Sequence, residues 1–176
     1  PPPPPPHLFF FHPDPGFLDS SVTGVQTCCS SDLRLEFVNI NGGEPNLRTD
    51  LVEIAELLLT RLPKLNNLTL NTNGLPTERC VENCRRILAL CQAHKVRFGV
   101  SVSLHRIGAG FDEIAGIPDA YRKVKATLDG LKSLRSERGF YLSTNCVLTP
   151  ANVGEAEGML RWGADEGIPV NFTVAE

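Results

Sequence analysis

From residue 35 onward, short β-prone runs alternate with longer stretches that carry a helical pattern of apolar residues, and this alternation restricts the possible folds most. Strands are predicted at residues 35–40, 68–71, 97–104, 140–148 and 170–174. Each intervening stretch is long enough for a crossover helix, so successive strands are expected to run parallel. The sequence therefore predicts an α/β fold, either an open doubly wound sheet or part of a barrel.

Amphipathic helices are predicted between these strands from apolar residues spaced three and four apart. Their stripes are Leu47, Leu51, Ile54, Leu58 and Leu62, ending before Pro63; Val81, Cys84, Leu88 and Cys91, after a start near Pro76; and Val124, Leu128 and Leu131. Residues 153–166 form a weaker helical pattern that contains glycines. The glycine-containing stretch from residue 105 through Pro118 is predicted to be a loop.

Residues 1–33 differ in character from the rest of the chain. Pro1 to Pro6 is a homopolymer restricted to extended polyproline geometry, and residues 22–33 resemble the translation of a common sequencing-library adapter. We therefore expect residues 1–33 to be an artefactual or disordered segment and residues 34–176 to form one domain. The single methionine is Met159, so the chain is expected to be a fragment of a longer protein.

The composition argues against two classes of partner. Seventeen Lys and Arg against twenty Asp and Glu give a net charge of −3, which does not favour a surface for nucleic acid. No apolar stretch reaches the ~18–20 residues that a membrane helix needs. We expect a soluble protein that binds neither nucleic acid nor a membrane.

Polar motifs lie at the carboxyl ends of the first four predicted strands, where ligands gather in parallel α/β folds. They are Asn41-Gly-Gly-Glu-Pro45, Leu70-Asn-Thr-Asn-Gly74, Val102-Ser-Leu-His105 and Asn145-Cys-Val-Leu-Thr149. Adjacent glycines let a ligand approach the backbone, and their carbonyls with the Glu44 carboxylate are acceptors suited to an ammonium group. The structural alternative for the first motif is an ordinary strand-to-helix turn.

The order and spacing of these four motifs resemble those of the radical S-adenosylmethionine (SAM) superfamily, in particular its molybdenum-cofactor cyclase and SPASM-type branches. The resemblance covers about residues 35–176 and includes Phe111 to Pro118. It implies that residues 34–176 are an incomplete radical SAM core domain. Its fold would be a partial parallel (β/α)6 barrel containing strands two to six.

The resemblance also implies a set of cofactor-binding residues. Gly42, Gly43 and Glu44 would hold the α-ammonium group of SAM, Thr72 and Ser103 would lie beside its methionyl or ribose part, and Asn145 would lie near the ribose. The full expected set is Gly42, Gly43, Glu44, Pro45, Thr72, Asn73, Ser103 and Asn145. Thr72 and Ser103 have a structural alternative, which is to cap the loops that follow them. No residue is assigned as catalytic.

The cysteines depart from the family pattern. Radical SAM enzymes bind a [4Fe–4S] cluster through Cys-x3-Cys-x2-Cys after the first strand, and this sequence lacks that spacing. Cys80 and Cys91 would lie ~16 Å apart on a straight helix, so with Cys84 they are predicted to be core thiols. Cys146 is a lone strand thiol. No metal ligand is therefore predicted, and the three-cysteine loop is expected to be encoded upstream in the parent protein.

A second departure is His105, at a position where many relatives have Asp. It is expected to be either a proton-transfer group or a polar group at the barrel mouth.

The resemblance implies a function for the parent protein. It would cleave SAM reductively to a 5′-deoxyadenosyl radical that abstracts hydrogen from a peptide or small-molecule substrate, with electrons from a donor such as a flavodoxin or ferredoxin. It would be cytoplasmic, and this chain would be inactive without the cluster loop. The alternatives are a non-catalytic SAM-binding or interaction module and a barrel lyase. The lyase is disfavoured because the lysines cluster on predicted helices, at Lys123, Lys125 and Lys132.

Overall fold

The structure is a computed structural model that describes residues 35–175, so the prediction for residues 1–33 lies outside the described part of the chain. The strands are β1 (Phe37–Ile40), β2 (Asn67–Thr72), β3 (Arg97–Ser103), β4 (Phe140–Leu148) and β5 (Val170–Val174). The α-helices are α1 (Leu51–Arg61), α2 (Thr77–Ala93), α3 (Ala109–Ala115), α4 (Ala120–Lys132) and α5 (Ala156–Glu166). Three short 3-10 helices are η1 (Pro45–Leu47), η2 (Ser133–Ser136) and η3 (Val153–Glu155).

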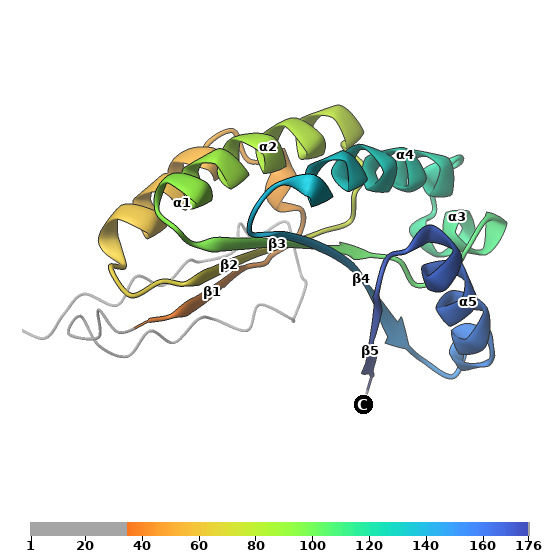
Figure 1. The fold of residues 1–176 in the computed structure, drawn as a ribbon. Helices are drawn as coiled ribbons and strands as arrows, with labels where there is room; N and C mark the ends of the chain where they lie inside the picture. The colour runs from red at the N-terminus through yellow and green to blue at the C-terminus, as the bar shows by residue number, and fades with distance from the viewer. Residues whose placement is uncertain (1–34, 176) are drawn as a thin grey trace, which may run out of the picture.

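The five strands form one parallel sheet in the order β1-β2-β3-β4-β5. This confirms the predicted α/β class and the parallel pairing. A doubly wound sheet reverses its strand order at a switch point, whereas the described sheet adds each strand beside the previous one. β4 and β5 also curve away from the plane of β1 to β3 (Figure 1). The order and curvature are compatible with part of a barrel.

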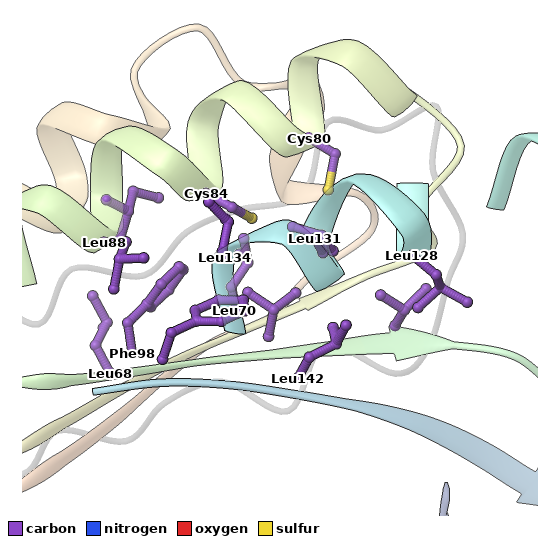
Figure 2. Close-up of a cluster of buried hydrophobic side chains, with 14 of the residues drawn as sticks. Leu68, Leu70, Cys80, Cys84, Leu88, Phe98, Leu128, Leu131, Leu134 and Leu142 are labelled. Atoms are coloured by element: carbon purple, nitrogen blue, oxygen red, sulfur yellow. The ribbon is translucent and has the colours of Figure 1, made fainter. Parts of the chain in front are cut away.

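Helices α1, α2 and α4 cover one face of the sheet (Figure 1). Alternate strand residues point into this layer, because successive side chains of a strand lie on opposite faces. Leu68 and Leu70 of β2 and Phe98 of β3 are fully buried there. Figure 2 shows them with Cys84 and Leu88 of α2 above the sheet. This apolar layer is the core of the described domain.

The opposite face of the sheet carries small polar side chains. Across the central strands, Asn71 pairs in register with Ser101 and Ser101 with Ser143, and one row further Ser103 pairs with Asn145. Parallel sheets covered by helices on both faces have nearly continuous apolar strands. The polar rows therefore show that this face is not built for a second layer of helices.

An aromatic ring crosses the polar face closer to the start of the strands. The Tyr141 side chain lies over Gly99 on the neighbouring strand, where an added Cβ would be 2.0 Å from the tyrosine Cζ. Its hydroxyl donates to Asn67 Oδ1 at 3.0 Å, so the side chain spans β4, β3 and β2. Tyr141 thereby separates the polar rows from the amino-terminal end of the sheet.

The sequence-based prediction starts the first helix earlier than the structure does. Leu47 belongs to η1 and is 65% exposed, whereas α1 starts at Leu51. Within α1 the buried side chains are Leu51, Val52, Ala55 and Leu59. The predicted Ile54, Leu58 and Leu62 are only half-buried. The buried face of α1 is thus shifted by about one position from the predicted one.

The prediction of a loop from residue 105 through Pro118 is wrong over α3. Gly108 and Gly116 bound this helix, and both have positive φ. Phe111 anchors it, because its ring is buried against Tyr121 of α4 with ring centroids 6.5 Å apart. The Asp112 carboxylate accepts a hydrogen bond from the Tyr121 backbone N–H at 2.7 Å. A short helix with one apolar anchor leaves too weak a periodicity to be recognised.

The remaining predictions agree closely with the structure. The strands predicted at 140–148 and 170–174 are confirmed with those bounds, and the other three agree within two residues at each end. Val124, Leu128 and Leu131 are buried on α4, as are Cys84, Leu88 and Cys91 on α2, whereas the predicted Val81 is only half-buried. The last helix is also confirmed, with η3 as its first turn.

Two glycines of α5 provide a matched test of helix–sheet packing. A Cβ at Gly163 would lie 2.5 Å from Val170 Cγ2 and 2.8 Å from the Ile168 carbonyl oxygen, whereas one at Gly158 meets nothing within 4 Å. Gly163→Ala is expected to lower the free energy of unfolding by about 1–3 kcal/mol through overpacking. Gly158→Ala is expected to raise it by about 0.5–1 kcal/mol, because alanine favours a helix. Urea unfolding followed by circular dichroism measures both, and a stabilising Gly163→Ala would contradict the packing.

Candidate functional site

The carboxyl ends of the strands lie along one edge of the sheet, because all five strands are parallel. This edge collects the four polar motifs that the sequence singles out. The first two motifs contact each other directly through Glu44, Thr72 and Asn73. The third and fourth are adjacent through the register pair Ser103 and Asn145. The predicted site residues therefore form two groups on neighbouring strands.

The Gly42-Gly43 segment presents its backbone at the end of β1. Both glycines are exposed, and a Cβ at either would meet nothing within 4 Å. Gly42 has φ +148, which L side chains rarely adopt. The Asn41 side chain supports this conformation by accepting a hydrogen bond from the Gly42 N–H at 3.1 Å. The segment therefore leaves space for a ligand to approach the backbone closely.

Both oxygens of the Glu44 carboxylate accept hydrogen bonds from the protein. Oε1 accepts from the Asn46 backbone N–H and from Asn46 Nδ2, both at 3.0 Å, and from Thr72 Oγ1 at 2.7 Å. Oε2 accepts from the Asn73 backbone N–H at 2.6 Å. Glu44 is also the N-cap of η1, in which Pro45 is the first residue. The carboxylate thus holds the loop after β1 against the end of β2.

The Thr72 side chain points into the helix-covered layer. It lies on the same face of β2 as Leu68 and Leu70 and is 2% exposed. Besides donating to Glu44, its hydroxyl oxygen accepts from the Gly74 N–H at 3.0 Å and from Asn46 Nδ2 at 3.1 Å. The structure therefore gives Thr72 the loop-capping role that the sequence left open as an alternative.

Asn46 and Asn83 complete this network, and sequence reasoning missed both. Asn46 is fully buried, and its Oδ1 accepts from Asn83 Nδ2 on α2 at 3.1 Å. Asn46 Nδ2 also lies 3.4 Å from Cys80 Sγ. The available signal was the position of Asn46 directly after Glu-Pro, where a side-chain amide can reach a preceding carboxylate. Asparagine is mostly an exposed residue, so its burial is not evident from the sequence.

Ser103 and Asn145 lie half-buried on the polar face, at the ends of β3 and β4. Asn145 Oδ1 accepts from Thr173 Oγ1 of β5 at 3.3 Å. Its amide nitrogen and the Ser103 hydroxyl form no hydrogen bond with other residues in the described range. A hydroxyl and an amide with unused capacity on neighbouring strands can bind the hydroxyl groups of a ligand.

His105 lies just beyond the end of β3, and its contacts continue the pairing with β4. Its Nδ1 accepts from the Val147 backbone N–H at 3.0 Å, and its carbonyl accepts from Asn152 Nδ2 at 3.1 Å. An accepting Nδ1 requires a neutral ring with the proton on Nε2. Burial lowers the pKa of His105 in the same direction. Of the two predicted roles, the geometry favours a structural polar group at the end of the strands.

The cysteines confirm the prediction of core thiols. Cys80, Cys84, Cys91 and Cys146 are free and buried. Burial raises the pKa of Cys91 to about 12 and also raises that of Cys146. Iron–sulfur clusters require thiolate ligands. Within residues 35–175, no group of three or more His, Cys, Asp or Glu side chains is arranged to hold a metal ion, so these residues do not fit a [4Fe–4S] cluster.

The lysines also lie away from the strand ends, as predicted. Lys123, Lys125 and Lys132 are all on α4. Lys125 contacts Asp129 at 2.7 Å and Glu166 of α5 at 3.2 Å, and Lys132 pairs with the same two carboxylates. The pairs with Glu166 join α4 to α5. The described strand ends therefore offer no lysine for a Schiff base.

No protein-family model matches the chain. The chain resembles GTP 3′,8-cyclases. The enzyme of that name from Listeria monocytogenes serovar 1/2a is 32% identical over 137 residues, which are 77% of this chain and 37% of that protein. The one from Streptomyces coelicolor is 25% identical over 161 residues, or 88% of this chain and 42% of that protein. The chain thus spans well under half the length of the curated relatives it matches.

None of the described helices is both long and apolar enough to cross a membrane.

The His105 contact predicts a pH effect on stability. In the unfolded chain His titrates near ~6.5, and burial lowers the pKa in the folded state. As the pH falls through about 6.5, His105 binds a proton more readily in the unfolded state than in the folded state. His105 should therefore make the free energy of unfolding fall as the pH drops from about 7.5 to about 5.5. His105→Asn keeps an acceptor for Val147 N–H but does not titrate. Urea unfolding at both pH values should show a smaller loss for this variant, and an equal loss would contradict the contact.

Proposed function

We propose that this chain forms the SAM-binding part of a radical SAM enzyme, with the five strands as strands two to six of a (β/α)6 barrel. The observation that carries the proposal is the single edge at which the sequential parallel sheet collects the four polar motifs. The similarity to GTP 3′,8-cyclases supports the same assignment. The polar face would be the inside of the barrel, and the helices would form its outer layer.

SAM would lie along the strand ends in this proposal. The exposed backbone of Gly42 and Gly43 would face its ammonium group, and Ser103 and Asn145 would bind its ribose or methionyl part. Asn73 lies between these two groups, with its backbone N–H on Glu44 and its Oδ1 on the Leu75 N–H at 2.9 Å. The residues of the site are neutral apart from Glu44. They would orient the ligand by hydrogen bonds rather than by charge.

When bound with a reduced cluster, SAM supplies the chemistry of reductive sulfonium cleavage for hydrogen abstraction. The described residues do not fit that cluster, so we assign its cysteines to another part of the parent protein. The substrate is proposed to be a peptide or a small molecule, and a flavodoxin or ferredoxin would supply the electron. We place the parent enzyme in the cytoplasm.

A second candidate is a non-catalytic SAM-binding module. The observation that favours it is the lack of cluster ligands among residues 35–175. Equilibrium dialysis together with turnover of the intact parent protein separates the two. Tight binding without 5′-deoxyadenosine formation indicates the module, and formation of 5′-deoxyadenosine indicates the enzyme.

The proposed contacts predict how variants change SAM affinity. Ser103→Ala and Asn145→Ala are each expected to weaken binding about 3- to 10-fold, the effect of one lost hydrogen bond. Thr69→Ala is the matched control, because Thr69 lies on the same face but bonds to Asn39 Oδ1 at 3.0 Å, away from the strand ends. Isothermal titration calorimetry measures the affinities. An intact parent that fails to bind SAM, or equal effects of all three variants, would contradict this site.

The cluster assignment has its own test. Anaerobic reconstitution of this chain with iron and sulfide is expected to give no stoichiometric [4Fe–4S] absorption and no 5′-deoxyadenosine, because its described thiols are buried in the core. Cys84→Ala, compared with the unsubstituted chain, controls for adventitious iron and should leave the trace absorption unchanged. Stoichiometric cluster absorption with 5′-deoxyadenosine formation would show that the assignment is wrong.

A further inference from the structure

We propose that Glu44 is a positioning residue: its carboxylate fastens the end of β1 to the end of β2 and holds the Gly42-Gly43 backbone in place, and it does not itself contact the ligand. The inference rests on the proposed SAM site and changes the role of one of its residues. We refer to the four hydrogen bonds that Glu44 accepts from Asn46, Thr72 and Asn73 as the Glu44 latch.

The oxygens of the Glu44 carboxylate already accept hydrogen bonds from the protein. Each oxygen of an ionised carboxylate has about two acceptor positions. Glu44 Oε1 receives three hydrogen bonds, from the Asn46 N–H, Asn46 Nδ2 and Thr72 Oγ1, and Oε2 receives one from the Asn73 N–H. Two of these donors are backbone N–H groups, whose positions the fold fixes. A ligand ammonium group that used Oε1 would have to displace one of its three donors. The displaced donor would then lose its partner in a half-buried site, which is costly.

The donors to Glu44 Oε1 lie on the helix-covered side of the sheet. Thr72 Oγ1, the donor to Glu44 Oε1, is in the helix-covered layer. Asn46, which donates to the same oxygen, is fully buried and is held in turn by Asn83 of α2. Ser103 and Asn145 are on the opposite, polar face. Oε1 therefore points toward the helices, away from the face on which the ligand is proposed to lie.

The position of β1 explains why the sheet needs such a latch. Within the described chain β1 is a four-residue edge strand that pairs only with β2. Its last paired residue is Ile40, so the segment after it is outside the ladder. Glu44 reconnects the chain to Thr72 and Asn73, 28 and 29 residues away in sequence. Gly42 and Gly43 are thereby held between two fixed points, and the latch sets where their backbone lies.

The test compares Glu44→Gln, Thr72→Val and the double variant in the full chain. Glu44→Gln removes the charge and replaces one acceptor oxygen by an amide donor, and Thr72→Val removes the hydroxyl that donates to Glu44. Without ligand, each single variant should lower the melting temperature by at least ~2–4 °C. The double variant should lose clearly less than the sum, because both changes break the same contact. Additive losses would overturn the latch.

Ligand affinity separates positioning from direct contact. If Glu44 acts through the glycine loop, Glu44→Gln and Thr72→Val should weaken SAM binding by similar factors. Both should leave the affinity for methylthioadenosine, which lacks the ammonium group, nearly unchanged. If Glu44 held the ammonium group itself, Glu44→Gln would weaken SAM binding and Thr72→Val would not. That second pattern would overturn the proposal.

Two further variants keep the test decisive. Glu36→Gln is the matched control, because Glu36 accepts from Asn66 Nδ2 at 3.2 Å beside the opposite end of β1 and is exposed. It should change neither the melting temperature nor SAM affinity. Thr72→Ser retains the hydroxyl and should behave like the unsubstituted chain, even if Glu44→Gln fails to fold. A chain that binds no SAM would count against the proposed function, whereas the coupling in ligand-free stability judges the latch independently.

Discussion

Burial of only one face of the parallel sheet is the constraint on which the rest of this structure depends. Leu68, Leu70 and Phe98 pack beneath α2 and α4, and this apolar layer supplies the main driving force for folding. Because strand side chains alternate, the same registration places Ser101, Ser103 and Asn145 on the other face. A slip of one residue would exchange the two faces. The packing of the core therefore also fixes which polar groups are available to a ligand.

The site depends on a second, polar layer of organisation at the strand ends. Glu44, Asn46 and Thr72 join the loop after β1 to β2 and α2 by buried hydrogen bonds. Such groups are costly to bury unless they are satisfied, so a complete network specifies one arrangement. Apolar packing alone would leave the edge strand and its glycines free to shift. The polar network turns a flexible sequence into a defined backbone surface.

The sequence was informative where many residues repeat one pattern. Helix α4 and strands β4 and β5 were predicted closely, because Val124, Leu128 and Leu131 recur at helical spacing and the strands are β-prone. Helix α3 could not be predicted, since it depends on one long-range contact of Phe111. The four motifs lie along one edge of the sheet, as expected for the ends of parallel strands. The partners of Glu44 were not evident, because they come from Thr72 and Asn73 on another strand and from the buried Asn46.

The Tyr141 ring bounds the polar rows on the side where the strands start. A molecule on the polar rows would meet this ring on the side of the strand starts, because the ring and its bond to Asn67 cross β2, β3 and β4 there. Four residues of β4 separate Tyr141 from Asn145, which corresponds to about 13 Å of extended strand. One aromatic side chain thus sets the extent of the polar rows along the strands.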